Sequence, residues 1–136
     1  MKKSPVSGYA GAVRIQRLTL GGITKAQKHG ERLDESSKRR VIADIPPVTT
    51  SGLDLQTLYK RHVKGDVFIP HAKCKALHII VQFPTDLVDG GDADGMLGHA
   101  RRFAERVFED RAVFADRVDR DEEGQHVVDL FIAPIY

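Results

Sequence analysis

The sequence has little of several residue types that would mark particular classes of protein. It contains one cysteine, Cys74, and no tryptophan among 136 residues. A single cysteine cannot form an internal disulfide, and such usage is typical of a reducing compartment. No apolar run approaches the roughly 18 to 20 residues that span a bilayer, and the basic N-terminal stretch has no apolar segment behind it. We therefore expect a cytoplasmic protein that has no membrane partner.

The common signatures of nucleotide, zinc-ribbon and serine-hydrolase sites are also missing. The sequence has no G-x-x-x-x-G-K-[ST], no G-x-G-x-x-G after a strand, no paired C-x-x-C and no G-x-S-x-G. Hydrophobic residues make up 41% and charged residues 29% of the chain, which is ordinary for a globular protein. Any site must therefore be built mainly from histidines, carboxylates and basic side chains.

Positive charge is concentrated near the N-terminus. Residues 1 to 40 hold ten Lys or Arg against three Asp or Glu, a charge of +7, so the remaining residues carry −5 to give the net charge of +2. A basic segment attracts polyanions because neutralised phosphates release counterions; the alternative is a solvated charged surface. The candidate DNA-binding residues in this segment are Arg14, Arg17, Lys25, Lys28, Lys38, Arg39 and Arg40.

Hydrophobic periodicity predicts one compact α+β domain over residues 1–136. Period-2 and β-branched patterns indicate strands at 11–20, 75–84, 112–118 and 126–134, and helical spacing indicates helices at 23–32, 55–63 and 96–109. This order favours an antiparallel sheet with helices packed on one face, which leaves the other face for a site. Because the sequence stops directly after an apolar strand, we expect it to be the N-terminal part of a longer protein.

His29 and Arg32 are the first candidate site residues. They lie three positions apart, so on a helix they share one face. This spacing places an imidazole beside a permanent cation, a pair that suits a phosphate. From spacing alone, a solvated surface remains the stronger interpretation.

The last predicted hairpin holds a second cluster. Asp119, Glu122, His126 and Asp129 lie within eleven residues and offer oxygen and nitrogen donors for manganese or magnesium. A polar turn followed by a strand is the alternative. In a regular strand His126 and Asp129 point to opposite faces, so a shared metal requires a β-bulge at Val127-Val128.

The order of these features resembles the Mob/Pre-type (MobV-like) plasmid mobilisation relaxases. Those proteins carry a strand with an R-x-Q-like pattern followed by K-H-x-E-R, similar to residues 14–16 and 28–32 here. Their metal motif reads H-x-D-E-x-x-P-H-x-H before apolar residues and a proline, and a helix similar to the segment 98–118 precedes it. The resemblance covers roughly residues 12–40 and 96–135, and it implies an HUH-relaxase-like palm.

The resemblance implies roles for the matching residues. His29 takes the position of the nucleophile that attacks a DNA phosphate, Arg32 helps hold that phosphate, and Glu31 is the acid of the motif. Glu122 matches the acidic metal ligand and His126 the first histidine of H-x-H. The chain departs from the motif at three positions: Asp119 stands at an expected histidine, Val128 replaces the second histidine, and Pro134 comes one residue late. Asp129 is then the candidate substitute ligand.

These features predict a metal-dependent nickase that cuts one strand at a plasmid origin of transfer and forms an adduct through His29. Its partners would be single-stranded or supercoiled plasmid DNA and accessory proteins of conjugation. One alternative is a degenerate DNA-binding accessory module of mobilisation or replication, and another is an unrelated α+β interaction domain. Three tyrosines are alternative nucleophiles: Tyr9, Tyr59 and Tyr136.

Overall fold

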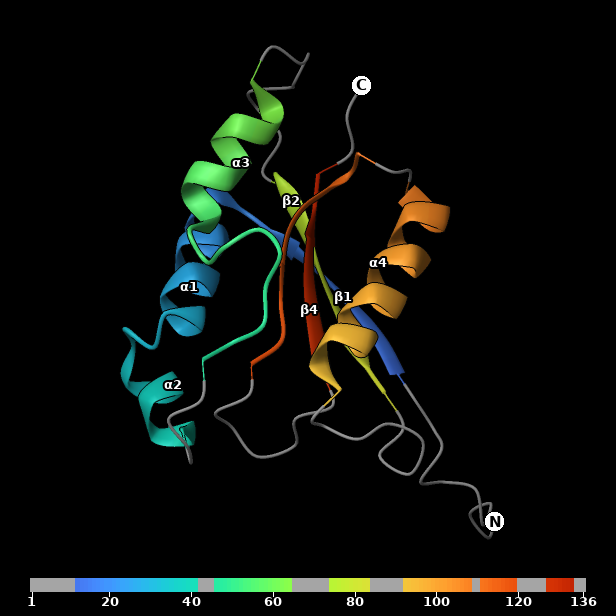
Figure 1. The fold of residues 1–136 in the computed structure, drawn as a ribbon. Coiled ribbons are helices and arrows are strands. Elements are labelled where there is room, and N and C mark those ends of the chain that lie inside the picture. Colours follow the sequence, from blue (N-terminus) through green and yellow to red (C-terminus); the bar gives the residue numbers. More distant parts are fainter. Residues whose placement is uncertain are drawn as a thin grey trace, which may run out of the picture.

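The computed structural model describes residues 12–41, 46–64, 74–83, 92–108, 111–119 and 127–133. Its centre is a four-stranded antiparallel sheet with the strand order β1-β2-β4-β3 (Figure 1). The strands are β1 (Ala12–Leu18), β2 (Ala76–Gln82), β3 (Val113–Arg117) and β4 (Val127–Ile132). Each of the four strands lies within a range that periodicity predicted, which confirms the α+β class.

Helices cover both faces of this sheet. On β2, Ile79 and Val81 pack with α4 (Ala93–Phe108), while Ala76 packs on the opposite side with α1 (Leu20–Gly30) and α3 (Leu55–Val63). Figure 1 shows α1 and α3 on one side of the sheet and α4 on the other. The expectation that all helices pack on one face is therefore wrong. An amphipathic helix must bury its apolar stripe, but its sequence does not specify which face of the sheet it covers.

Local sequence explains where the helices begin. The hydroxyl of Thr19 accepts a hydrogen bond from the Gly22 amide, which starts α1, and the Asp54 carboxylate accepts one from the Thr57 amide, which starts α3. The short helix α2 (Glu35–Arg40) has no apolar stripe, so hydrophobic periodicity did not predict it. Among the described residues, none of the helices is long and apolar enough to cross a bilayer.

A β-bulge in β3 decides which way its charged residues point. Val113 pairs with Ile132, but the next paired residue is Ala115, opposite Phe131, so Phe114 is an extra residue in the strand. The bulge shifts the alternation by one position. Asp116 therefore faces the side that α4 covers, and Arg117, opposite Asp129, faces the side of α1.

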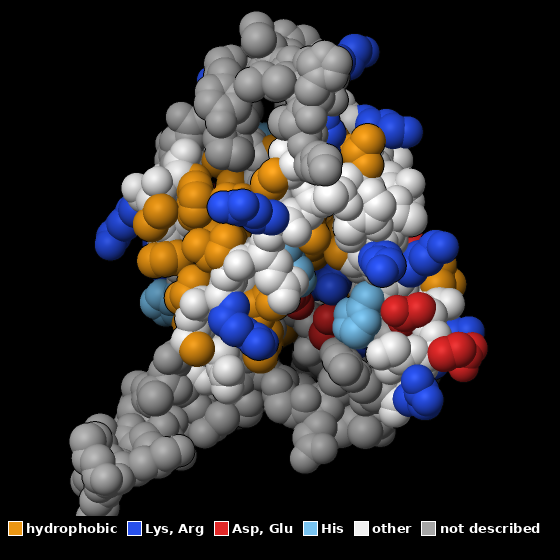
Figure 2. All heavy atoms as spheres, turned by 180° about the vertical axis from the view of Figure 1, so that it is seen from behind, with side chains coloured by type: hydrophobic (Ala, Val, Ile, Leu, Met, Phe, Trp, Pro, Cys, Tyr) orange, Lys and Arg blue, Asp and Glu red, His pale blue; other side chains and the backbone are white. Residues whose placement is uncertain are grey.

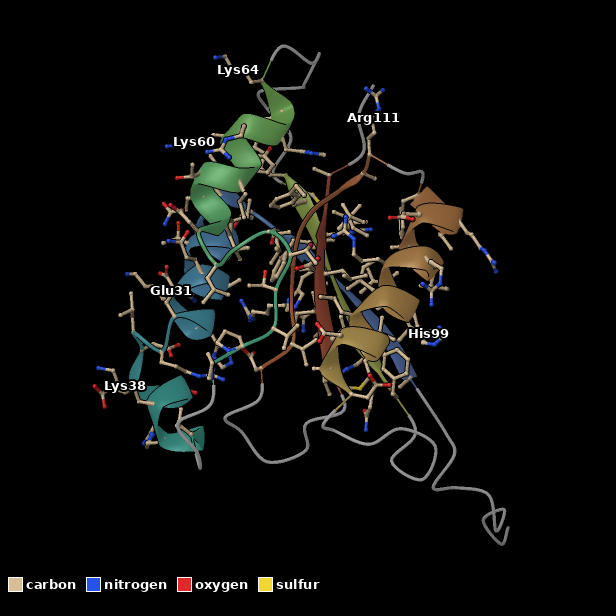
Figure 3. The ribbon with its side chains drawn as sticks, viewed as in Figure 1. Glu31, Lys38, Lys60, Lys64, His99 and Arg111 are labelled. Carbon is tan, nitrogen blue, oxygen red and sulfur yellow. The ribbon has the colours of Figure 1, made fainter. Side chains whose placement is uncertain are left out.

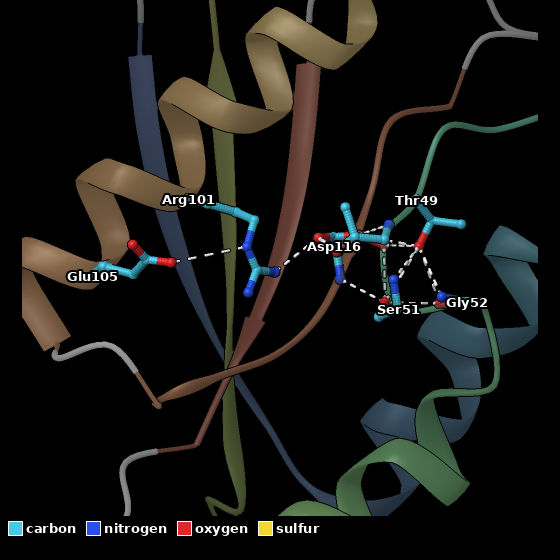
Figure 4. Close-up of polar contacts among 7 residues, drawn as sticks. Thr49, Ser51, Gly52, Arg101, Glu105 and Asp116 are labelled. Carbon is cyan, nitrogen blue, oxygen red and sulfur yellow. Dashed lines mark hydrogen bonds and ion pairs between the residues drawn. The ribbon is translucent and has the colours of Figure 1, made fainter.

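Asp116 ties three parts of the chain together on the α4 side (Figure 4). Its carboxylate is 1% exposed and accepts hydrogen bonds from the Thr50 amide at 2.7 Å and from Arg101 of α4 at 2.7 Å. Its backbone carbonyl accepts a bond from the Thr49 hydroxyl, and its backbone amide donates one to the Ser51 hydroxyl. The loop before α3, the strand β3 and the helix α4 are thus joined through one residue.

We expect Asp116→Ala to lower the free energy of unfolding by about 3 kcal/mol, because removing one partner leaves buried polar groups unpaired. Urea denaturation followed by circular dichroism measures the change. The exposed Arg106 of α4 provides a control, since Arg106→Ala should change stability by less than about 0.5 kcal/mol. Equal effects of the two substitutions would contradict this reading of the network.

Candidate functional site

The C-terminal end of α1 carries His29 and Arg32 to the edge of the sheet. The helix ends at Gly30, and Arg32 follows with φ of 58°, in the left-handed region that a residue with a side chain rarely adopts. This turn directs the Arg32 guanidinium back, so that Nη1 donates to the His29 carbonyl at 2.9 Å and Nη2 lies 3.7 Å from Asp119 Oδ1. The strained backbone is thus balanced by contacts of its own side chain.

The guanidinium of Arg117 lies between two carboxylates. Its Nε is 3.3 Å from Asp119 Oδ2 and 3.8 Å from Asp129 Oδ2, and its side chain is only 4% exposed. Its Nη1 donates to the Ala26 carbonyl of α1 at 3.0 Å. A Cβ at Gly30 would come within 2.9 Å of the Arg117 Cζ, so only glycine permits this close approach. Arg117 therefore anchors the end of α1 to the sheet.

His78 of β2 completes the cluster from the neighbouring strand. Its Nε2 lies 2.7 Å from Asp129 Oδ1, and its ring stacks on Phe131 with a centroid separation of 4.5 Å. The Phe131 ring, which is fully buried, also lies 5.4 Å from the Arg117 Cζ. One core aromatic thus supports both partners of Asp129.

The environment of Asp129 holds its carboxylate in the charged form. Burial acts to raise the pKa of Asp129, but the hydrogen bond from His78 and the positive charge of Arg117 outweigh it, so the pKa lies below its ordinary value of 3.8. His29 also lowers this pKa through its charge. Gly30, the residue after His29, packs against the Arg117 guanidinium, so His29 lies next to the cluster.

His29, Arg32, Arg117, Asp119 and Asp129 come from distant parts of the chain and meet on one face. The His29 side chain is 27% exposed, and its Nδ1 lies 4.0 Å from Asp34 Oδ2, a contact that becomes an ion pair only when the imidazole is protonated. Figure 2 shows histidine, basic and acidic side chains gathered beside a hydrophobic patch on the face seen from behind. An imidazole and an accessible guanidinium in this arrangement can bind a phosphate and attack it.

The structure tests the predicted metal ligands only in part. Asp119 and Asp129 lie close together, and both contact the Arg117 guanidinium. Glu122 and His126 lie outside the described residues. Within the described ranges, no three His, Cys, Asp or Glu side chains are arranged to hold a metal ion. Val127, Val128 and Asp129 pair with β2 in continuous register, so the bulge at Val127-Val128 that a metal shared by His126 and Asp129 requires is absent. The bulge lies in β3 instead.

Glu31 has its described contact away from the cluster. Its carboxylate accepts a hydrogen bond from Gln27 Nε2 at 3.3 Å, and Gln27 in turn accepts one from the Gln56 amide of α3. A catalytic role for Glu31 stays a prediction. Of the alternative nucleophiles, Tyr59 packs against Phe114 in the core, where burial raises the pKa of its hydroxyl; Tyr9 and Tyr136 lie outside the described residues.

The predicted DNA-binding residues spread over two faces. Arg14 pairs with Ile80 and faces the cluster side, whereas Arg17 pairs with Leu77 and faces the α4 side. Lys25 follows the spacing of His29 on α1, four residues apart, and is exposed. Figure 3 shows Lys38 on the outer side of the molecule, at α2. Lys28 and Arg39 are exposed as well, and the Arg40 side chain lies outside the described part.

Sequence reasoning missed His78 and Arg117. A signal for His78 was present, because alternation in β2 places it opposite the apolar face formed by Leu77, Ile79 and Val81. Arg117 was visible only as one of two charged residues, with Asp116, at the end of a strand that begins with apolar residues. Its direction depends on the bulge, which the sequence does not mark.

The strand order and the helices on both faces give the chain a fold similar to that of relaxase domains. The matching structures are of the MobM relaxase domain (MOBV; Mob_Pre) bound to origin-of-transfer DNA of plasmid pMV158. One manganese-bound crystal structure at pH 6.8 is 14% identical, has a TM-score of 0.66, and is matched over 90% of this chain and 69% of that chain. A complex with a 26-nucleotide DNA is 12% identical, with a TM-score of 0.65 over 93% and 70% of the two chains. No family model and no curated protein sequence matches this chain.

The depressed pKa of Asp129 predicts a loss of stability in acid. A carboxylate whose pKa is lower in the folded than in the unfolded state stabilises the fold at any pH above its unfolded-state pKa. This stabilisation is lost as the pH falls toward and through its folded-state pKa. We expect Asp129→Asn to cost about 2 kcal/mol at pH 7 and progressively less below about pH 4. Urea denaturation at several pH values measures this.

The exposed Asp94 of α4 provides the control, because Asp94→Asn should leave the stability at pH 7 nearly unchanged. If the difference in the free energy of unfolding between wild type and Asp129→Asn stays constant from neutral pH to about pH 3, the charge of Asp129 contributes nothing to stability.

Proposed function

We propose that this chain is a relaxase-like DNA nickase that cuts one strand at a plasmid origin of transfer and stays attached to it through His29. The observation that supports this most is the convergence of His29 and Arg32 with the charged cluster of Arg117, Asp119 and Asp129. The similarity to relaxase domains bound to origin-of-transfer DNA adds support at the level of the fold.

The proposed reaction is an in-line displacement at phosphorus. The Nε2 of a neutral His29, the ring nitrogen that does not face Asp34, attacks the phosphate. A P–N bond forms as the P–O bond to one bridging oxygen breaks, and the released oxygen takes up a proton. Arg32 holds the non-bridging oxygens, because its guanidinium lies at the end of α1 with His29 and is 15% exposed.

Basic residues on the cluster side would position the strand. Arg14 of β1 and Lys25 of α1 are exposed there, and contacts to phosphates fix a strand in place without reading its sequence. Arg17 faces the other side of the sheet, so it is the weaker candidate for a phosphate contact. Single-stranded or supercoiled plasmid DNA is therefore the proposed partner, and binding of conjugation accessory proteins stays a prediction.

A divalent cation, manganese or magnesium, is the cofactor that the sequence predicts, and several of the similar structures are manganese-bound. Of its predicted ligands, the two that are described do not fit this use, because Asp119 and Asp129 are both ion-paired with Arg117. The proposed cleavage therefore uses no metal ion at these two carboxylates. A site that uses Glu122 and His126 stays a prediction.

The second candidate function is a DNA-binding accessory module that does not cut. The engagement of Asp119 and Asp129 by Arg117 favours it, since the site departs here from the metal motif. Both candidates predict salt-dependent DNA binding, so only a cleavage assay separates them.

His29→Ala should reduce nicking by about 10³-fold or more and abolish the covalent adduct, because no nucleophile remains at the phosphate. The assay follows the conversion of a supercoiled plasmid that carries a candidate origin of transfer, with and without manganese. Denaturing gels with labelled single-stranded DNA detect the adduct. His99 is exposed on α4, across the sheet from α1 (Figure 3), so His99→Ala is the matched control. Nicking that survives His29→Ala would remove His29 from the mechanism.

Arg32→Asn should weaken single-stranded DNA binding about 10-fold and reduce the slope of log K against log salt by about 0.7, the share of one phosphate contact. Asparagine tolerates the left-handed backbone at this position, so the fold should be kept. Fluorescence anisotropy over a salt series measures both quantities. Arg106→Asn removes the same charge from α4 and should leave the slope unchanged; a salt slope near zero for the wild type would exclude phosphate tracking.

A further inference from the structure

The buried guanidinium of Arg117 occupies the space between the two carboxylates that the sequence offers to a metal. Asp119 approaches its Nε at 3.3 Å and Asp129 at 3.8 Å. Arginine stays positively charged at every relevant pH, so this charge is a fixed part of the protein. The two carboxylates therefore have a cation already.

We propose that Arg117 takes the place of a divalent cation between Asp119 and Asp129, so that this chain acts on DNA without a metal ion at these carboxylates. The inference rests on the nickase function proposed above, because it specifies how the charge of that site is supplied. It sets the chain apart from the manganese-bound relaxase domains whose fold it shares.

Electrostatics supports the replacement. Manganese and magnesium bind carboxylates whose oxygen lone pairs are available, whereas each carboxylate here already has an oxygen directed at the guanidinium. A divalent ion placed between the same oxygens would lie within a few ångströms of a permanent positive charge, and like charges this close repel strongly in a partly buried site. The guanidinium would have to leave before the ion could enter.

Packing holds the guanidinium in place. Its Nη1 is bonded to the Ala26 carbonyl, Gly30 lies directly against it, and the Phe131 ring lies 5.4 Å from its Cζ. Moving Arg117 outward would break the contact between the end of α1 and the sheet. Arg117 is therefore a positioning residue, because it holds the segment of α1 that carries His29. The cation that binds the phosphate is Arg32, which lies on the outer side of Asp119.

The test is manganese binding, measured by the electron paramagnetic resonance signal of free Mn²⁺ and by the melting temperature. Any Mn²⁺ binding by wild type up to about 1 mM, and any rise in its melting temperature, should be unchanged by Asp129→Asn, because the proposal leaves no metal ion at Asp119 and Asp129. Arg117→Met leaves the two carboxylates and His78 without the cation. This variant should melt lower than wild type, and Mn²⁺ should raise its melting temperature by about 5 °C or more.

Arg101→Met is the matched control. It breaks an arginine-aspartate pair on the opposite face of the sheet, with Asp116, where the remaining donors are hydroxyl and amide groups. It should lower the melting temperature with no recovery in Mn²⁺. Recovery in both variants, or in neither, would overturn the proposal.

The wild-type titration is decisive even if Arg117→Met fails to fold. Saturable Mn²⁺ binding by wild type that Asp129→Asn weakens at least about 10-fold would overturn the proposal, because Asp129 would then be a ligand. Nicking by wild type in excess chelator supports both the proposal and the nickase function. If wild type nicks DNA only with Mn²⁺, and Asp129→Asn weakens Mn²⁺ binding, the proposal about Arg117 is overturned while the nickase function is retained. Absence of nicking and of adduct under all conditions overturns the proposed nickase function. The Mn²⁺ titration then still tests whether Arg117 replaces a metal ion.

Discussion

The β-bulge at Phe114 is the constraint on which the two polar centres of the molecule depend. Without the extra residue, strict alternation along β3 from Val113 would turn Asp116 toward α1 and Arg117 toward α4. With it, Asp116 meets Arg101 of α4, and Arg117 meets the carbonyl of Ala26 in α1. Two adjacent residues of opposite charge thus each find their partners, on opposite faces of one sheet. A buried charge is tolerated only when it is paired, so the bulge and the two networks require each other.

The charged cluster is also continuous with the hydrophobic core. Phe131 is fully buried and packs with Phe114, and its ring lies against both the His78 imidazole and the Arg117 guanidinium. Because close-packed aromatic rings allow little movement, the partners of Asp129 are held by the same contacts that stabilise the fold. The end of α1 is joined to this unit through Ala26 and Gly30. The position of His29 is therefore set by the core and not by a loop.

The sequence predicted the elements well and their assembly less well, for physical reasons. Alternation in β2 and helical spacing in α4 are local patterns, so both elements were predicted from them, although α4 begins at Ala93, three residues before the predicted start. The face that α4 covers and the bulge at Phe114 depend on packing between segments distant in sequence, which no local pattern records. His29 and Arg32 were found through their spacing and a family resemblance, and Arg32 does approach Asp119. Arg117 was missed because its partners become visible only when β3, β4 and α1 are assembled.

Asp119 links the structural and the proposed functional parts of the site. One of its oxygens faces Arg117, which is 4% exposed, and the other faces Arg32, which is 15% exposed. A single carboxylate between two guanidiniums divides its interaction between them, so the strength of one pair depends on the geometry of the other. A phosphate bound at Arg32 would compete with Asp119 for that guanidinium and leave the carboxylate more available to Arg117. A phosphate of DNA bound at Arg32 would thereby strengthen the ion pair between Asp119 and Arg117. Arg117 is also the residue that holds α1, and with it His29, against the sheet.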